Sequence, residues 1–236
     1  MKPNLWGPTT SSKLPVNPSA VPADLNGLQT LARSSAWKHV VELASKLNDS
    51  SNEATISLPT KLRLEGLFRL KMFDDLAFET VNILSAERMK LLRQNDGVEA
   101  LRNSNNIYAM QLLLSEVKAM TGNSDDAFQD LCELRKELEE EIMTTPSPVS
   151  ISSHQWWLWR VTSSIINTAI RQRLWRMAVA ELTGLLDSMR TKFEEITSLD
   201  ISSSSTFIES FRRVEVIILC HLSRILLQVE PHYRYL

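Results

Sequence analysis

The sequence predicts an all-α fold built from antiparallel helix pairs. The 236 residues include only six glycines and three tyrosines, whereas Leu, Glu, Arg and Ala are abundant, which is typical of helical proteins. Apolar residues recur at spacings of three and four in several blocks, the period of a helix with one buried face. Polar stretches at 48–57, 95–106, 144–153 and 197–205 separate these blocks and predict the connections.

Residues 1–22 are expected to form a disordered or extended lead-in. This segment holds five prolines among Ser, Thr and Asn, and proline interrupts the hydrogen bonds of a helix interior. Such a composition buries too little apolar surface to offset the entropy of the chain. We therefore expect a helical domain over residues 23–229 and a tail over 230–236.

A tight turn is predicted between two helices near the middle of the chain. Five apolar residues share one face of a helix over 107–120, namely Ile107, Met110, Leu114, Val117 and Met120. Gly122 follows, where a left-handed residue ends a helix. The next helix opens at Ser124 and carries an apolar stripe of Ala127, Leu131, Leu134 and Leu138. We expect the two helices to pack antiparallel.

The same unit recurs elsewhere as an aromatic residue followed three positions later by a small or aliphatic one. The pairs are Trp37 with Val40, Phe73 with Leu76, and Trp175 with Ala178. Each aromatic is predicted to begin a second helix, and the offsets of three, seven and ten residues resemble the tetratricopeptide repeat. Ser124 replaces the aromatic in the third unit, and the units lie 36, 51 and 51 residues apart instead of about 34. We therefore expect a degenerate tetratricopeptide-repeat solenoid with longer helices and inserted loops.

Several segments together resemble the subunit 12 family of the TRAPP (transport protein particle) vesicle-tethering complex. They are the leading helix 25–31 running into 36–43, the segment 67–74 that ends in Lys71, Met72, Phe73 and Asp74, and the Leu-Trp-Arg start at 158–160. The resemblance covers roughly residues 24–228 and corresponds to the front of the family's repeat region.

The resemblance implies a non-catalytic scaffold subunit of a TRAPP-like complex in vesicle traffic between endoplasmic reticulum and Golgi. Its partners would be other protein subunits, and it would be cytoplasmic, peripherally associated with endoplasmic reticulum and Golgi membranes through the complex. TRAPP assemblies promote nucleotide exchange on Rab-family GTPases, an activity that the family places in other, smaller subunits. The alternative is a general tetratricopeptide adaptor in another pathway, distinguished by the proteins that co-purify with it.

The chain departs from this family at its last helix, predicted over 207–229. The partner helix and later repeats that the family leads us to expect do not follow. Terminal repeats normally present a polar outer face, but this helix is strongly apolar through Phe211, Val214, Ile218, Ile225 and Leu226. The hypothesis is a fragment or shortened product that exposes half a repeat, or a chain whose last helix is covered by something else.

The sequence shows no arrangement typical of catalysis, and we expect neither an enzyme nor a bound cofactor or metal. His39, His154, His221 and His232 are too scattered to form a metal pair. A glycine-rich phosphate loop, a nucleophile elbow and a zinc-binding His-Glu-x-x-His helix are all absent. A helical enzyme would need a buried polar cluster that the sequence does not reveal.

The net charge, the cysteines and the hydropathy indicate which kinds of partner the chain lacks and that its thiols are reduced. A formal net charge of -2 argues against nucleic acid as a partner, because phosphate binding depends on basic residues. Cys132 and Cys220 lie in leucine-rich helical patterns, which predicts reduced, packed thiols. The most apolar stretch, 214–229, is interrupted by charged residues, so we expect no membrane insertion. We also expect no small-molecule substrate.

Stacked repeats would place first-helix residues along a concave groove. Offsets from the aligned turns put Glu65, Glu116, Arg160 and Asn167 on that surface, where we expect them to bind an extended segment of a partner. The groove lacks the Lys, Arg and Asn cluster with which chaperone-binding repeats hold a carboxylate.

Other polar and aromatic clusters are predicted to be structural. Trp159 and Trp175 are expected to fill the space between two helices, while Trp156 and Trp157 point about 100° apart, so that one faces outward. The acidic run 137–141 is interpreted as a solvated helix face and not as a docking patch. The serines at 202–205 are expected to form a loop.

Overall fold

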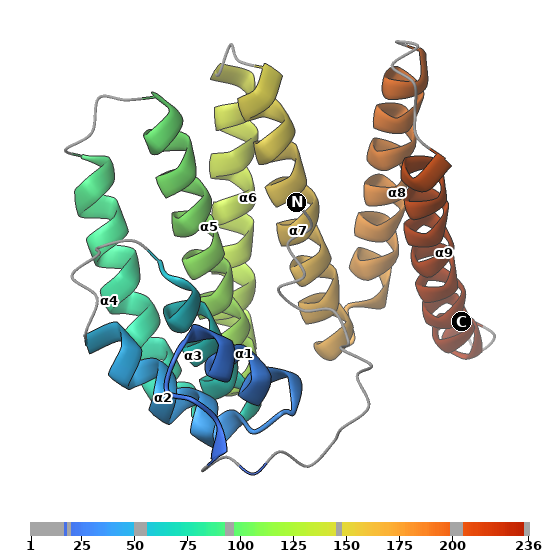
Figure 1. The fold of residues 1–236 in the computed structure, drawn as a ribbon. Helices are drawn as coiled ribbons and strands as arrows, with labels where there is room; N and C mark the ends of the chain where they lie inside the picture. Colours follow the sequence, from blue (N-terminus) through green and yellow to red (C-terminus); the bar gives the residue numbers. More distant parts are fainter. Residues whose placement is uncertain are drawn as a thin grey trace. The chain divides into compact units, whose positions relative to one another are not determined.

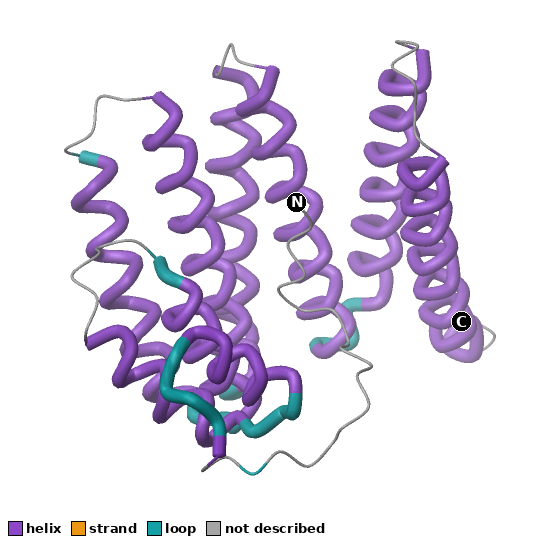
Figure 2. The backbone as a smooth tube through the Cα atoms, in the orientation of Figure 1, coloured by secondary structure: helices purple, strands orange, loops and turns teal. Residues whose placement is uncertain are grey.

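The computed structural model describes residues 17, 20–49, 56–92, 97–144, 148–198 and 205–233. Within these ranges the chain is helical and forms no strand (Figure 2). The helices are α1 (Leu25–Arg33), α2 (Trp37–Asp49), α3 (Leu58–Arg69), α4 (Phe73–Leu91), α5 (Gly97–Met120), α6 (Ser124–Thr144), α7 (Pro148–Arg171), α8 (Trp175–Ser198) and α9 (Ser205–Tyr233). The prediction of an all-α chain is confirmed for the described residues.

The helices fall into two compact units, residues 1–117 and residues 118–236. In the first unit, α1 packs on α2 and α3, α2 packs on α3, and α3 packs on α4. Residues of α5 complete the core of that unit. In the second unit, α6 packs on α7, α7 on α8, and α8 on α9. From α1 to α4, and from α6 to α9, helices that follow one another in the sequence therefore lie side by side (Figure 1).

Four connections between described helices are tight turns with the same backbone geometry. One residue in each turn has a positive φ, which is 61° at Ser35, 60° at Lys71, 100° at Gly122 and 60° at Arg173. The following amide donates to the carbonyl five positions earlier, at 2.9–3.0 Å, in the pairs Ala36–Leu31, Met72–Leu67, Asn123–Lys118 and Leu174–Ala169. This is the Schellman ending of a helix, which satisfies a carbonyl that has no partner within the helix.

The second helix of each pair starts where the sequence predicts, at Trp37, Phe73, Ser124 and Trp175. The third residue after each start has no exposed surface, namely Val40, Leu76, Ala127 and Ala178. The seventh residue is also buried, namely Ala44, Thr80, Leu131 and Leu182. The predicted core positions at the third and seventh residues are therefore confirmed. The tenth residue is buried at Leu134 and Leu185 but only half-buried at Leu47 and Ile83.

The buried apolar side chains form separate clusters along the chain. In the first unit, one cluster joins α1 and α2 through Leu28, Leu31, Val40 and Ala44. A larger cluster there joins α3, α4 and α5 through Leu64, Leu67, Leu76, Leu84, Ile107, Met110, Leu113 and Val117. In the second unit, α7, α8 and α9 share a cluster that includes Ile166, Ala178, Leu182, Leu185, Ile218 and Ile225.

Three predicted boundaries are wrong. The polar stretch 95–106 is helical from Gly97 onward, and the stretch 144–153 is helical from Pro148 onward. Proline is well suited to the first position of a helix, because the amide that it lacks has no partner there. Helix α9 runs past Val229 to Tyr233, so the predicted tail is shorter than expected. Most of the lead-in, residues 202–204 and residues 234–236 lie outside the described residues.

The prediction that the helix before Gly122 has one apolar face is also wrong. Helix α5 buries Tyr108 and Leu112 as well as Ile107, whereas Met120 is 44% exposed. Apolar residues on several sides are typical of a helix with neighbours on more than one side.

Candidate functional site

The four residues predicted to line a groove lie in different units. Glu65 on α3 and Glu116 on α5 belong to the first unit, and Arg160 and Asn167 on α7 belong to the second. Their grouping into one groove stays a prediction.

Glu65 is part of a small charged and aromatic cluster. Its carboxylate contacts the Arg69 guanidinium at 3.5 Å, one helical turn away. That guanidinium in turn lies over the Trp37 ring, 5.7 Å from the ring centroid. Burial raises the pKa of Glu65, and the Arg69 charge opposes the increase. Arg69 is itself exposed, so the cluster presents an oriented guanidinium to solvent, a group suited to a carboxylate or carbonyl of a partner.

The other predicted groove residues differ in accessibility. Asn167 is exposed on α7, between the buried residues Ile166 and Thr168. Its amide is able to donate and to accept hydrogen bonds, as recognition of a peptide backbone requires. Glu116 and Arg160 are half-buried. Of this set, Asn167 is therefore the residue most open to a partner.

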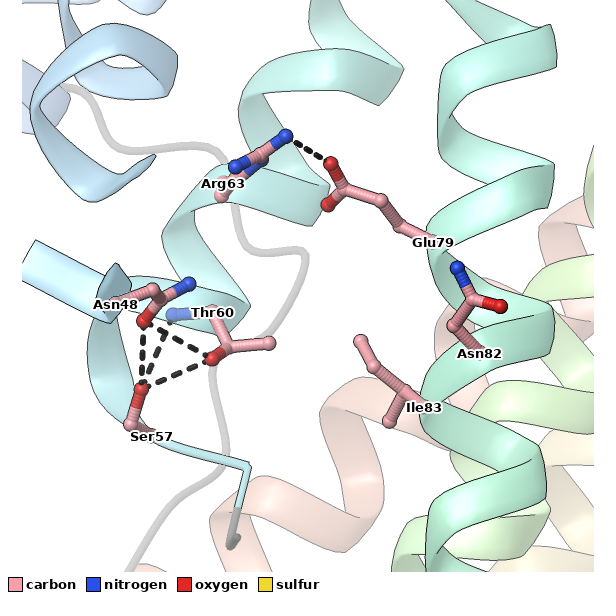
Figure 3. A pocket seen from close by; sticks show the side chains of 7 residues that line it. All are labelled: Asn48, Ser57, Thr60, Arg63, Glu79, Asn82 and Ile83. Atoms are coloured by element: carbon pink, nitrogen blue, oxygen red, sulfur yellow. Dashed lines mark hydrogen bonds and ion pairs between the residues drawn. The ribbon is translucent and has the colours of Figure 1, made fainter. Parts of the chain in front are cut away.

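A polar depression of about 350 Å³ lies in the first unit (Figure 3). It is lined by the end of α2, the start of α3 and the middle of α4, through Asn48, Ser57, Thr60, Arg63, Glu79, Asn82 and Ile83. All but the last of these side chains are polar. The depression was not among the sites predicted from the sequence.

Arg63 connects the three helices that line the depression. Its Nη1 donates to Ser45 Oγ on α2 at 2.8 Å, and its Nη2 forms an ion pair with Glu79 on α4. Burial raises the pKa of Glu79, although the charge of Arg63 lowers it. The Nε of Arg63 is buried without a hydrogen-bond partner among the described residues. The guanidinium is thus fixed in place and largely neutralised by Glu79.

Hydroxyl groups organise the other wall of the depression. Ser57 caps α3 by accepting a hydrogen bond from the Thr60 amide at 3.3 Å. The Oγ of Ser57 and the Oγ1 of Thr60 both donate to Asn48 Oδ1, at 3.1 and 3.3 Å. Figure 3 shows these three side chains grouped on the side away from Asn82 and Ile83.

The chemistry of the depression suits hydrogen bonding. The charges of Arg63 and Glu79 in the lining neutralise each other, and amide and hydroxyl groups make up most of the rest. Polar peptide groups therefore fit the depression better than a charged ligand does.

The sequence does contain a signal for this depression. Arg63 on a first helix and Glu79 on the following second helix are complementary charges on faces that a helix hairpin brings together.

The tryptophans behave as the sequence predicts. Trp159 and Trp175 pack against the core cluster of the second unit, and Trp159 Nε1 donates to Ser188 Oγ at 3.1 Å. Trp156 and Trp157 form an edge-to-face pair with ring centroids 4.7 Å apart. Trp156 is 43% exposed and is the one that faces outward.

The acidic run 137–141 is mostly a solvated face, since Glu137, Glu139 and Glu140 are exposed. The exception is Glu141, whose Oε2 lies 3.1 Å from Nε2 of His154. His154 is buried. This contact links α6 to α7 and was not predicted.

The prediction that both cysteines pack against other residues is wrong for one of them. Cys132 is half-buried, and burial raises the pKa of its thiol, which disfavours the reactive thiolate at neutral pH. Cys220 is exposed on α9, so the prediction that it packs against other residues is wrong.

No group of three His, Cys, Asp or Glu side chains able to hold a metal ion occurs in the described part of the chain. No described helix combines the length and the apolar character needed to cross a bilayer.

No protein-family model, curated protein or solved structure matches this chain. The resemblance to the TRAPP subunit rests on the sequence motifs alone.

Proposed function

We propose that this chain is a non-catalytic scaffold whose helix pairs stack as degenerate tetratricopeptide repeats within a TRAPP-like tethering complex. Its role would be to hold other subunits of the complex during vesicle traffic between endoplasmic reticulum and Golgi. The pathway comes from the resemblance of the motifs around Trp37, Phe73, Trp159 and Trp175.

The observation that supports the repeat most strongly is the fourfold recurrence of one turn. Each turn has its left-handed residue two positions before the second helix and the same hydrogen bond across five residues. Each is followed by buried residues at the third and seventh positions of that helix. A unit repeated with the same packing positions is the basis of a solenoid, in which each repeat contacts its neighbours.

A recurring acidic residue gives independent support. The sixth residue after the start of a second helix is Glu79 in α4, Asp130 in α6 and Glu181 in α8. Each pairs with a base from a different helix, and the bases are Arg63, Lys118 and Arg135. The base lies on the preceding helix for Glu79 and Asp130, and on α6 for Glu181. The shared acidic position supports the proposal that these helix pairs are variants of one unit.

The experiment is to express the tagged chain in cells, purify it in mild salt and identify the bound proteins by mass spectrometry. Recovery of the TRAPP core with its large scaffold subunits supports the proposal. Recovery of other proteins alone favours the general adaptor, and contradicts the TRAPP assignment.

A matched pair of variants tests the predicted groove in the same experiment. Arg160→Glu reverses a charge on the predicted binding surface, and Arg171→Glu reverses an exposed charge at the end of the same helix. We expect the first variant to lose the bound subunits and the second to retain them. Equal recovery with both variants removes Arg160 from the binding surface.

A further inference from the structure

The outer face of α4 carries large apolar side chains that the fold leaves in solvent. Phe78 is 70% exposed and Leu92, at the end of the helix, is 82% exposed. Val81 and Met89, between them, are about half exposed. We call these four residues the α4 stripe.

Helical geometry makes the α4 stripe continuous. Successive members are separated by three or eight residues, and the small Ser85 lies midway between Val81 and Met89. Residues at spacings of three, four or eight lie on one face of a helix. From Phe78 to Leu92 the stripe runs about 21 Å at 1.5 Å per residue. This length equals about four turns of a second helix.

The other second helices show that the fold does not require this stripe. The position of Phe78, the fifth after the helix start, is Glu42 in α2, Gln129 in α6 and Ala180 in α8. The position of Met89 is Glu140 in α6 and Thr191 in α8. Equivalent helices therefore carry polar or small residues at the positions of Phe78 and Met89, whereas α6 also exposes an apolar residue, Met143, at the position of Leu92. Exposed apolar residues that form a row mark an interaction surface.

The charges beside the α4 stripe indicate the chemistry of what binds there. Asp74 and Asp75 are exposed in the first turn of α4, and neither forms an ion pair with a described residue. Arg88 is exposed near the other end. A binding helix with basic residues at one end would complement the two aspartates, whereas an anionic membrane surface would be repelled by them.

We propose that the α4 stripe binds an amphipathic helix of another protein, about four turns long, with Lys or Arg at the end that lies against Asp74 and Asp75. Its apolar side chains recur every three or four residues and cover Phe78, Val81, Met89 and Leu92, as when two amphipathic helices pack side by side. The proposal rests on the exposure and charge of α4 and is independent of the TRAPP assignment.

The test begins with selection of helical peptides, displayed on phage, against the immobilised full chain. A selected peptide is then synthesised with a fluorescent label, and its Kd is measured by fluorescence anisotropy. We expect enriched sequences with the stated apolar spacing and basic residues near one end. Phe78→Glu is expected to weaken binding at least about tenfold, because it removes the aromatic side chain of the stripe and puts a charge in the apolar contact.

Matched controls come from α6. Gln129→Glu introduces the same charge at the position equivalent to Phe78, and is expected to change the Kd less than about twofold. Asp74→Asn with Asp75→Asn is expected to weaken binding several-fold and to reduce its salt dependence. Asp125→Asn with Asp126→Asn, at the equivalent positions of α6, is expected to leave the Kd unchanged. Circular dichroism verifies that each variant remains helical.

Three results would overturn the proposal. The first is that no selected peptide depends on Phe78, or that the dependent peptides carry acidic ends. The second is self-association of the chain that Phe78→Glu abolishes, measured by sedimentation, which would make a second copy the occupant. The third is Phe78-dependent binding to vesicles of anionic lipid, which would make the occupant a membrane.

Discussion

The second helices α4 and α6 each follow a turn of the same kind. They differ in which side chains they bury and expose, because α4 has a polar residue inside and an apolar one outside, and α6 has the reverse. At the fourteenth position after the helix start, α4 buries Glu87 and α6 buries Leu138. On the outside, α4 exposes Phe78 where α6 exposes Gln129. At these two positions, the place of a residue in the helix pair determines whether it is buried. Whether the buried residue is polar or apolar depends on the partners that neighbouring helices offer it.

Glu87 is tolerated inside because its carboxylate is fully used. One oxygen accepts a hydrogen bond from Asn106 Nδ2 on α5 at 2.9 Å, and the other pairs with Lys90 Nζ at 2.5 Å. A buried carboxylate without such partners would be very costly. Glu87 therefore ties α4 to α5 within the first unit, whereas Leu138 contributes only packing.

We expect the largest loss of stability when Leu138 of α6 is replaced by glutamate, the residue that α4 buries at the equivalent position. Leu138→Glu places a carboxylate at a position with no exposed surface, and we expect a loss of about 4 kcal/mol or more. Urea denaturation followed by circular dichroism measures the loss. Glu137→Leu, at the exposed neighbouring position, should stay within about 0.5 kcal/mol of wild type. Tolerance of Leu138→Glu would show that the site is wetter than the structure indicates.

Substitutions of Glu87 separate packing from hydrogen bonding. Glu87→Ala leaves a cavity and removes the acceptor for Asn106, so we expect a loss of about 2–4 kcal/mol. Glu87→Leu, the residue of α6, fills the space but leaves Asn106 without its acceptor and Lys90 without its ion-pair partner, so we expect a loss of about 1–3 kcal/mol that includes no cavity. Urea denaturation followed by circular dichroism measures the loss of stability in both variants. If leucine is as harmful as alanine, the link to Asn106 carries the stability.

Substitutions in the turns before α4 and α6 are expected to change the stability by smaller amounts and in opposite directions. Lys71, with φ of 60°, occupies the place that Gly122 has in the turn before α6. Lys71→Gly should stabilise the chain by up to about 1 kcal/mol because it relieves backbone strain. Gly122→Ala should destabilise it by about 1 kcal/mol. Thermal melts detect both, and a loss of stability in Lys71→Gly would mean that the lysine side chain makes a stabilising contact.

The smallest effect concerns the pH dependence of Glu79. Burial raises its pKa above the ordinary 4.5, so the folded chain binds a proton at a pH where the unfolded chain has released it. The contribution of Glu79 to the free energy of unfolding therefore falls as pH rises through the window just above 4.5. Glu79→Gln should flatten this part of the stability profile, measured by denaturation between pH 4.5 and about 7. Glu42→Gln, exposed on α2, is the control for losing one negative charge, and an unchanged profile in Glu79→Gln would contradict the prediction.

The sequence predicted the second helices well because their signals are local. An aromatic or capping residue followed by apolar residues at helical spacing is sufficient to place Trp37, Phe73, Ser124 and Trp175 at helix starts. It failed for the first turns of α5 and α7. The Asn- and Ser-rich segment before Ile107 has weak helix propensity, yet contacts such as that of Asn106 with Glu87 hold it in α5. Tertiary contacts override propensity there.

The candidate sites were less accessible to sequence reasoning. The depression around Arg63 depends on which faces of α2, α3 and α4 meet, and this is a property of packing. The burial of Glu87 was missed because a charged residue in a helix is usually interpreted as solvated. The α4 stripe had a signal in the sequence, since Phe78, Val81, Met89 and Leu92 share a face, but only exposure distinguishes it from a core stripe.

The packing of consecutive helices has a consequence for how the chain acquires its structure. Because α6 meets α7, and α7 meets α8, through short connections, little entropy is lost in closing the loops between them. Chains dominated by such local contacts fold rapidly, in microseconds to milliseconds for small helical domains. Each hairpin is thus able to form soon after its second helix leaves the ribosome, and slow refolding phases are expected only from isomerisation of the nine prolines.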